Sequence, residues 1–553
     1  MDGDRSKGGQ SMPGMIVAPQ PVAVEEGAKV LMRGGNAIDA AVTCAFVQSL
    51  VNPQMCGIGG YLILTARMAA QPVDGRSDNV VAIDAPALAG SRATPDMWQD
   101  IALRPNPGGW GYFVKGKVND AGYQSICTPG TVKGLSTMLE HWGTISWAEA
   151  ITPAERIARE GFVVDADLAA GWRHKAAYPE ASSLLDYVMA NKEARRVYLH
   201  ADGTPYEPGE TLRNPDYANT LAHLASCGPE DFYVGELAAR MGADLQANNS
   251  FVTESDLAGY EIRWPDPVIG TYRGLTIATA PPPHGGPTLL ALLNILEGYD
   301  LKDLGHNTPE YILLVAMAMK AAFADRNPLL GDPEYVDVPL DWMISKERAV
   351  EWRAVIDRGD PISVSFVPPE SPDTTHVSVV DQWGNCVALT HSLGSSSGVI
   401  TPGLGFMYNN SMVNFRPWPG HPNSIAPGKS RTTGMAPTVV FRSGQPILVI
   451  GAPGATRIIT SVAQVILNVV DFGMSVSDAV LAPRFDCQAD MIECQARVPE
   501  FVCTQVRERH PIHRMPYSHG GLALVHAIGL SPETGALAGG ADTGSGGMAL
   551  LAE

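Results

Sequence analysis

Apolar positions near the start of the chain predict two consecutive helices. Residues 24–31 mix apolar and charged positions as an amphipathic helix does, whereas residues 37–51 are rich in Ala, Val and Phe. The Gly34-Gly35-Asn36 string between them is typical of a helix end followed by a new helix start. We expect the second helix to be buried.

The segment 130–330 carries mostly helical patterns, with a capped start at Ser146. The apolar run Ile312–Met319 predicts a buried helix, because charged residues follow too soon for a membrane span. The Pro281–Gly286 string, which contains the single His284, is expected to form an exposed turn.

The C-terminal third changes to strand patterns. Prolines within residues 365–373 predict an extended, exposed connection. Runs rich in β-branched residues follow at 374–380 and 386–390, and the turn residues Asp381–Asn385 between them predict a hairpin. Further strand candidates are 438–441 and 447–450. We therefore expect a sheet formed largely by the C-terminal third and covered by helices.

Composition favours a globular protein that binds neither nucleic acid nor membranes. The 553 residues are 45% hydrophobic and 18% charged, which provides a large core and excludes wholesale disorder. With 39 basic against 58 acidic residues, the net charge of −19 repels phosphate backbones and anionic lipid surfaces. A small acidic substrate stays open, because a local pocket can oppose the overall field.

The sequence predicts neither a metal nor a cofactor. Its 8 cysteines form no C-x-x-C pair, and its 13 histidines lack the H-E-x-x-H spacing. Glycine strings that bind dinucleotides or nucleoside triphosphates are also missing. No apolar stretch of the secretory type stands at the N-terminus, so we expect a cytoplasmic protein, although export stays open.

The junction between Asp373 and Thr374 has a specific chemical use. If this bond is cut, Thr374 gains a free α-amino group beside its own hydroxyl. An α-amine has an ordinary pKa of roughly 7.7–8.0, so part of it is neutral near pH 7 and can serve as the general base for the hydroxyl. Many strands begin with Thr after a loop, so the spacing alone does not establish this chemistry.

A second element lies at Gly451-Ala-Pro-Gly-Ala-Thr-Arg-Ile458, which follows a predicted strand and precedes an apolar helical run. Small residues at such a turn can direct backbone N–H groups at a developing oxyanion. An ordinary strand-to-helix turn explains the string equally well on its own.

Taken together, the sequence resembles the γ-glutamyltranspeptidase family of N-terminal-nucleophile hydrolases over nearly its whole length. The strings that carry the resemblance are Gly34-Gly-Asn-Ala-Ile-Asp-Ala40, Gly57-Ile-Gly-Gly60, Thr128-Pro-Gly-Thr131, Phe232-Tyr-Val-Gly235, Asp373-Thr-Thr-His-Val-Ser378, Asp381-Gln-Trp-Gly-Asn385, Asn409-Asn410 and Gly451-Ala-Pro-Gly454.

The resemblance implies a four-layer αββα sandwich and a precursor that cuts itself before Thr374. The products would be a mostly helical large subunit, 1–373, and a small subunit, 374–553, intertwined in one fold and able to dimerise further. Thr374 would be the nucleophile and Thr375 would support it by hydrogen bonding. The backbone N–H groups of Gly454 and Ala455 would form the oxyanion hole.

The substrate-binding positions differ from the family pattern. The family's carboxylate-binding Arg is matched by Ala82, although Arg416 or Arg431 could replace it. Its ammonium-binding acid is matched by Asn414, in a string that also contains Ser411. A Ser-Ser pair becomes Thr433-Gly434, and Ser392 and Gly394 stand where Thr and Asn are usual.

These differences predict an amide-cleaving enzyme for which glutathione is a poor substrate. Two missing charge-assisted bonds, at about 1.5–3 kcal/mol each, would lower specificity by roughly 10²–10⁴. Cephalosporin-type acyl amides, oxamate-like amides and modified γ-glutamyl conjugates stay open, as does a true γ-glutamyl enzyme with a rearranged pocket. A non-catalytic binding relative is the other alternative.

Overall fold

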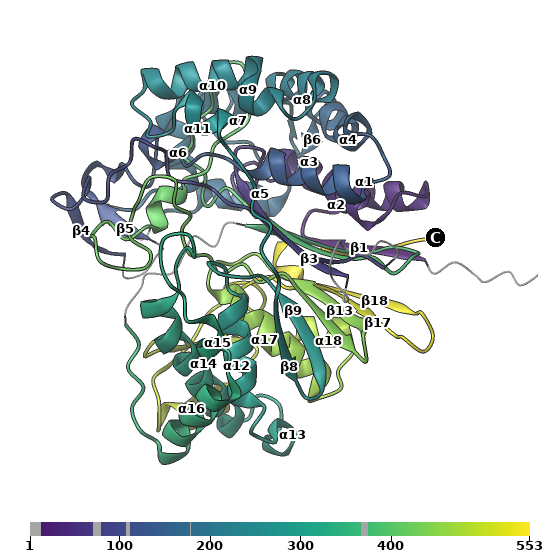
Figure 1. Cartoon of the computed structure of the whole chain (residues 1–553), viewed down its shortest axis with the longest axis vertical. Helices are drawn as coiled ribbons and strands as arrows, with labels where there is room; N and C mark the ends of the chain where they lie inside the picture. The colour runs from purple at the N-terminus through teal and green to yellow at the C-terminus, as the bar shows by residue number, and fades with distance from the viewer. Residues whose placement is uncertain (1–12, 70–78, 107–110, 177, 366–373) are drawn as a thin grey trace, which may run out of the picture.

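Two six-stranded sheets lie face to face, and helices cover the outer face of each sheet (Figure 1). This computed structural model describes residues 13–69, 79–106, 111–176, 178–365 and 374–553. The layers run helix, sheet, sheet, helix, so the predicted αββα sandwich is confirmed. The Pro-rich connection that precedes Thr374, including Asp373, lies outside the described residues.

The first sheet combines strands from both ends and the middle of the chain. Its order is β19 (Met548–Ala552), β1 (Gly14–Ala18), β10 (Thr375–Val380), β11 (Cys386–Ser392), β2 (Tyr61–Arg67) and β3 (Val80–Ala85). All neighbours in it are antiparallel. The β10–β11 pair, closed by Asp381–Asn385, is the predicted hairpin.

The second sheet is also antiparallel. Its order is β18 (Leu537–Ala541), β17 (His526–Leu530), β13 (Gln445–Gly451), β12 (Thr438–Arg442), β9 (Leu275–Thr279) and β8 (Val268–Tyr272). Strands β12 and β13 confirm the runs predicted at 438–441 and 447–450. The pair β8–β9 interrupts the segment predicted to be mostly helical.

Helices form two separate outer layers (Figure 1). Over the first sheet lie α1 (Pro21–Met32), α2 (Ala37–Val51), α3 (Thr131–Trp142), α4 (Trp147–Glu160), α5 (Ala166–Arg173), α6 (Leu184–Ala190), α7 (Lys192–Tyr198), α8 (Pro215–Cys227), α9 (Asp231–Val234), α10 (Glu236–Ala247) and α11 (Glu254–Ala258). Over the second lie α12 (Gly286–Leu296), α13 (Leu301–Leu304), α14 (Pro309–Leu329), α15 (Leu340–Met343), α16 (Lys346–Arg358), α17 (Arg457–Val470), α18 (Val476–Leu481) and α19 (Glu500–Arg507).

Short elements complete the fold. They are the strands β4 (Ala102–Pro105), β5 (Tyr112–Val114), β6 (Phe162–Val163), β7 (Thr211–Leu212), β14 (Phe485–Asp486), β15 (Ile492–Cys494) and β16 (Ile512–Arg514), and the 3₁₀ turns η1 (Lys115–Lys117), η2 (Tyr123–Ser125), η3 (Ser411–Asn414) and η4 (Thr543–Ser545).

The start of α2 shows why the predicted helices form where they do. The Asn36 side chain accepts the Asp39 N–H at 3.0 Å, and the Asp39 carboxylate accepts the Asn36 N–H at 2.8 Å. This reciprocal capping satisfies amides that the first helical turn leaves unpaired. Every residue of α2 is buried, as its composition predicts.

Alternating side chains on each strand separate two cores. In β1 and β10, Ile16, Val377 and Val379 pack toward the helices, whereas Met15 and Val380 pack between the sheets against residues such as Val449. The same alternation decides on which side of the sheet each residue near Thr374 lies.

One sequence prediction is wrong. The Pro281–Gly286 string is not exposed, since His284 is 1% accessible and packs beneath Thr433 and Asp84. Those partners lie far away in the sequence, so local turn composition could not reveal them. Among the described helices, none is long and apolar enough to cross a membrane.

Candidate active site

Thr374 immediately precedes the first residue of β10 and lies at the edge of the space between the two sheets. Its Oγ1 lies 3.2 Å from Ser392 Oγ, which accepts the Gly394 N–H at 2.8 Å. Ser392 in turn pairs with Tyr61 across β11 and β2. Thr374, Ser392 and Tyr61 therefore form one row across three neighbouring strands. Residue Thr374 is 7% exposed.

Thr375 lies on the opposite face of the same strand. Its hydroxyl donates to Gln20 Oε1 at 3.0 Å and accepts from Gln48 Nε2 at 3.0 Å. Gln48 Oε1 contacts His391 Nε2 at 2.9 Å, and burial lowers the pKa of His391 to about 3. Among the described contacts, the hydroxyl that bonds to Thr374 is therefore that of Ser392. The expected hydrogen bond between the Thr375 and Thr374 hydroxyls is not among them.

The turn between β13 and α17 brings Gly454 and Ala455 to the same region. Gly454 has φ 135° and Ala455 has φ 58°, so both adopt backbone conformations that L side chains rarely take. A methyl group on Gly454 would lie 2.6 Å from the Ala523 Cα. Within the part of the chain that the structure describes, neither backbone N–H donates a hydrogen bond.

A cavity of about 240 Å³ joins these two elements. Thr374 and Gln20 line it on one side, and Pro453 and Leu524 on the side of the turn. Its lining also includes Pro19, Val51, Asn52, Gln54, Met55, Asp165, Asp167, Leu168, Gly171 and Leu184. Thr374 and Pro453, the residue before the Gly454–Ala455 pair, therefore face one cavity.

The segment after Ser392 packs against Asn410, the residue before Ser411. Gly394 has φ 71°, and a Cβ there would lie 2.3 Å from Asn410 Oδ1, so this side chain packs against bare backbone. Asn410 accepts the Ser395 N–H at 2.9 Å and precedes η3. Ser411 Oγ is buried and has no hydrogen-bond partner among the described residues.

Asn414, at the end of η3, is buried with an unsatisfied side chain. It is 6% exposed, and neither its Oδ1 nor its Nδ2 has a hydrogen-bond partner in the described ranges. Its backbone carbonyl accepts from Asn423 Nδ2 at 2.8 Å, and Asn423 Oδ1 accepts the Thr432 N–H at 2.9 Å. Since buried amides normally find partners, this side chain has the properties of a ligand-binding group.

Thr433 and Gly434 lie against the candidate oxyanion turn. A Cβ on Gly434 would lie 2.2 Å from the Ala455 carbonyl oxygen, so only glycine permits this approach. Thr433 Oγ1 contacts His284 Nδ1 at 2.7 Å and accepts the Met435 N–H at 3.2 Å. Of the six expected substrate-binding residues, Ser392 thus contacts Thr374 and Gly434 packs against the turn, whereas none of the six lines the cavity at Thr374.

The strand register places Ala82 away from Thr374. Ala82 pairs with Thr65, which pairs with Ala388 and then Ser378, four residues beyond Thr374 in β10. At about 3.3 Å per residue, that row lies roughly 13 Å from the row of Thr374. Ala82 therefore lies in a different row of the sheet from Thr374.

Arg431 is the arginine that the fold brings near Thr374. Its guanidinium stacks on the Tyr61 ring, 5.1 Å from the centroid, and hydrogen-bonds the Tyr61 hydroxyl and, at 2.8 Å, the Thr432 carbonyl. Arg416 instead bonds through its backbone N–H to Asn423 at 2.9 Å. Sequence reasoning named both arginines but could not choose, and it missed Gln20, Gln48 and Asn423 because their contacts are long-range.

A cluster that could hold a metal lies elsewhere, on α8 and α9 in the outer helical layer (Figure 1). The ligand atoms of His223, Cys227 and Asp231 lie within 4.8 Å of one another. Both Asp231 oxygens already accept backbone N–H groups at the start of α10, each at 3.0 Å. The acid therefore has a structural role as a helix cap.

The chain is similar over nearly its whole length to proteins of one known family. The family model described as gamma-glutamyltranspeptidase matches residues 23–552. The acylase ACY 1 proenzyme of Pseudomonas sp. (strain V22) is 37% identical over 526 residues, covering 94% of this chain and 90% of the relative. The glutathione hydrolase proenzyme of Escherichia coli (strain K12) is 33% identical over 494 residues, covering 86% and 81%.

Among solved structures, the cephalosporin acylase from Bacillus halodurans superposes with a TM-score of 0.83 at 26% identity. The match covers 98% of this chain and 96% of that one. The whole four-layer architecture, rather than one sheet, is therefore shared.

Proposed function

The chain belongs to the gamma-glutamyltranspeptidase family, whose members are amide hydrolases and acyltransferases, and we propose that Thr374 is its nucleophile. In this proposal the precursor cuts itself between Asp373 and Thr374, giving subunits 1–373 and 374–553. The observation that carries it is the Thr374 hydroxyl, which bonds to Ser392 and lies in a cavity that Pro453, next to the Gly454–Ala455 pair, also lines.

Once cut, Thr374 supplies both the nucleophile and the base. Its neutral α-amine takes the proton as Oγ1 attacks the amide carbonyl. The N–H groups of Gly454 and Ala455 stabilise the oxyanion of the tetrahedral intermediate, which such preorganised donors bind more strongly than the ground state. The leaving amine takes the proton, and water or a second amine then releases the acyl group from Thr374.

We further propose that the preferred acyl group lacks the free α-amino group of a γ-glutamyl substrate. Asn414 is uncharged, so it cannot form an ion pair with a buried ammonium. Arg431, whose guanidinium stacks on Tyr61, is the residue that we propose to attract an acyl chain that carries a carboxylate. The acylase names of the Pseudomonas relative and the Bacillus structure support an acylase of this kind.

The nucleophile is tested by the denatured intact mass of the wild type beside Thr374→Ala. We expect two fragments that split between Asp373 and Thr374 in the wild type and a single 58.8 kDa chain in the variant. An uncut wild-type chain that still hydrolyses amides would remove Thr374 from this role.

The acyl preference is tested separately, with γ-glutamyl-p-nitroanilide against glutaryl-p-nitroanilide, which differ only by the amino group. The proposal predicts a kcat/KM for the glutaryl compound about 10²-fold or more above that of the γ-glutamyl compound. Equal values would contradict it without affecting the assignment of Thr374.

A further inference from the structure

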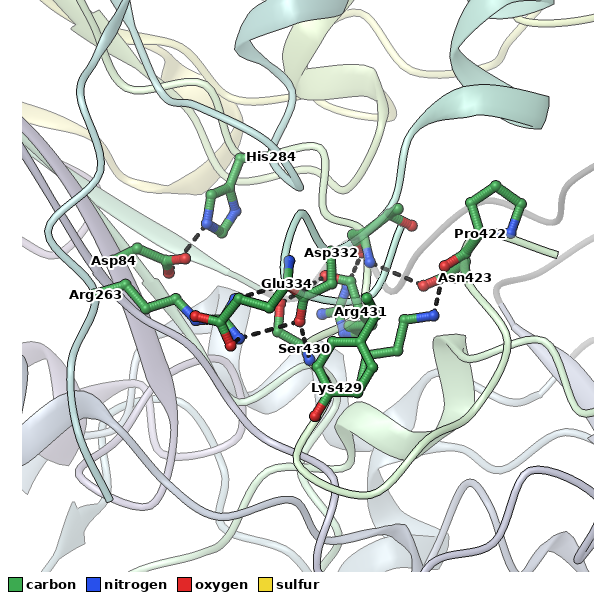
Figure 2. Close-up of polar contacts among 12 residues, drawn as sticks. Asp84, Arg263, His284, Asp332, Glu334, Pro422, Asn423, Lys429, Ser430 and Arg431 are labelled. Carbon is green, nitrogen blue, oxygen red and sulfur yellow. Dashed lines mark hydrogen bonds and ion pairs between the residues drawn. The ribbon is translucent and has the colours of Figure 1, made fainter. Parts of the chain in front are cut away.

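A line of buried polar side chains runs behind Thr433. His284 Nδ1 lies 2.7 Å from Thr433 Oγ1, and His284 Nε2 lies 3.1 Å from Asp84 Oδ1 (Figure 2 shows the His284–Asp84 pair). Asp84 and His284 are each 1% exposed. Three residues from distant parts of the sequence thus form one chain of contacts that ends at a candidate substrate-binding hydroxyl.

Backbone contacts hold each member of this chain in place. Asp84 lies in β3 and exchanges backbone hydrogen bonds with Arg263, at 3.1 and 2.7 Å. The His284 turn is tied to the Thr433 segment twice, by Thr433 N–H to the Pro283 carbonyl at 3.0 Å and by Gly285 N–H to the Met435 carbonyl at 2.8 Å. The imidazole therefore has little freedom to turn away from the Thr433 hydroxyl.

We propose that His284, paired with Asp84, is a positioning residue that fixes the orientation of the Thr433 hydroxyl toward the acyl group of the substrate. The inference rests on the proposed function, since that function places Thr433 in the substrate pocket. It adds a residue that determines which acyl groups the enzyme accepts.

Asp84 lies near two basic side chains, His284 and Arg263. Its Oδ1 lies 3.1 Å from His284 Nε2. Arg263 acts on the same carboxylate electrostatically, while its guanidinium hydrogen-bonds Asp332 at 3.0 and 3.1 Å and Glu334 at 2.9 Å (Figure 2). Among the described residues, His284 is therefore the basic side chain in ion-pair distance of Asp84.

Arg326 also contacts the backbone of the Thr433 segment. Its Nη2 donates to the Thr433 carbonyl at 3.3 Å. This contact fixes the main chain at position 433 and leaves the hydroxyl to His284.

The 2.7 Å contact with His284 Nδ1 fixes the direction of the Thr433 hydroxyl. The same oxygen accepts the Met435 N–H at 3.2 Å. These two contacts restrict the positions from which a carboxylate or carbonyl oxygen of the acyl group can reach the hydroxyl.

A double-mutant cycle tests whether His284 acts through Thr433. The variants are His284→Gln, Thr433→Val and the double variant, assayed with glutaryl-p-nitroanilide and with pentanoyl-p-nitroanilide, which has no terminal oxygen. We expect His284→Gln to raise the KM for the glutaryl compound about 10- to 100-fold, with kcat and the pentanoyl KM unchanged. In the Thr433→Val background, His284→Gln should have no further effect.

Thr433→Ser provides the comparison, because it keeps the hydroxyl: in this background His284→Gln should again raise the glutaryl KM, unlike in Thr433→Val. Equal losses with both anilides, or additive effects in the double variant, would overturn the inference in favour of a purely structural role.

A second measurement does not depend on turnover. With ¹⁵N-labelled histidine, the His284 ring signals, assigned through His284→Gln, should change in Thr433→Val and in Asp84→Asn, because both partners contact the ring. Ring signals that stay unchanged in both variants would overturn the inference. Failure of the wild type to cleave either anilide would instead count against the proposed function, while the ring signals still decide whether His284 contacts Thr433 and Asp84.

Discussion

The two sides of the candidate site differ in how their polar groups are satisfied. Around Thr374 and Thr375, the hydroxyls and amides bond to one another through Ser392, Gln20 and Gln48. Around Asn414, the side-chain amide is buried with no partner in the described ranges. Groups that are already hydrogen-bonded hold a reactive geometry before substrate arrives. A buried group without a partner gains its hydrogen-bond free energy only when a ligand binds.

This contrast implies that the first side determines the reaction and the second side determines the substrate. Four changes test that division, beginning with the largest expected effect.

Thr374→Ala should lower amide turnover at least about 10³-fold, because it removes the hydroxyl that the α-amine of the same residue would activate. Steady-state hydrolysis of an acyl-p-nitroanilide measures it. Thr375→Ala is the matched control, since its hydroxyl faces α2 and should leave most of the turnover intact. A comparable loss in both variants would erase the distinction between the two faces of β10.

Gly454→Ala should lower kcat by about 10²–10³-fold, the usual loss when an oxyanion donor is displaced. The added methyl would meet Ala523 at 2.6 Å and move the turn. Gly444→Ala is the control, because Gly444 also has positive φ but nothing lies within 4 Å of its Cβ position. The pair of kcat values, with thermal unfolding of each variant, separates turn displacement from general strain.

Asn414→Asp should shift the preference toward γ-glutamyl compounds by about 10- to 100-fold in relative kcat/KM, since a carboxylate can pair with the substrate ammonium. Self-cleavage before Thr374 should continue unchanged. If the same change stopped the cleavage, the reaction and the substrate preference would not belong to separate sides of the site.

The bonded side should also make the protein sensitive to acid. Burial lowers the pKa of His391 to about 3, whereas an unfolded histidine takes up a proton near pH 6.5. Falling pH therefore favours the unfolded chain between these values, by up to about 1.4 kcal/mol per pH unit for this one group. Urea unfolding at pH 7, 6 and 5 should show a smaller decline for His391→Gln than for the wild type.

Much of the fold could be predicted from local pattern. The Asn36 cap, the buried helix around Ile312–Met319 and the hairpin at Asp381–Asn385 each depend on residues close together in the sequence, and all three are present. Strands β8 and β9 were missed because they are short and lie within a helical region.

The substrate side was harder to predict, for a physical reason. Ala82 matches a family string, yet the strand register places it far from Thr374, and register is set by pairing partners that one sequence does not reveal. Arg431 and His284 reach the site only through contacts with Tyr61 and Thr433, which are distant in the chain. The identity of the catalytic string could be recognised, but the groups that face the substrate could not.

The order of strands in the first sheet constrains how a cleaved enzyme can arise. Strand β10 lies between β1 and β11, so chain from after position 374 is hydrogen-bonded on one side to chain from before it, and β19 adds to the outer side of β1. Before a cut at this position, folding is a first-order process whose rate does not depend on concentration. After it, recovery from denaturation becomes a second-order encounter of two polypeptides, each lacking strands of both sheets. An uncut chain that unfolds on heating can refold without a partner. Two separated polypeptides at low concentration would stay unfolded, because they must first meet, so cleavage would end the protein's capacity to refold as a single chain.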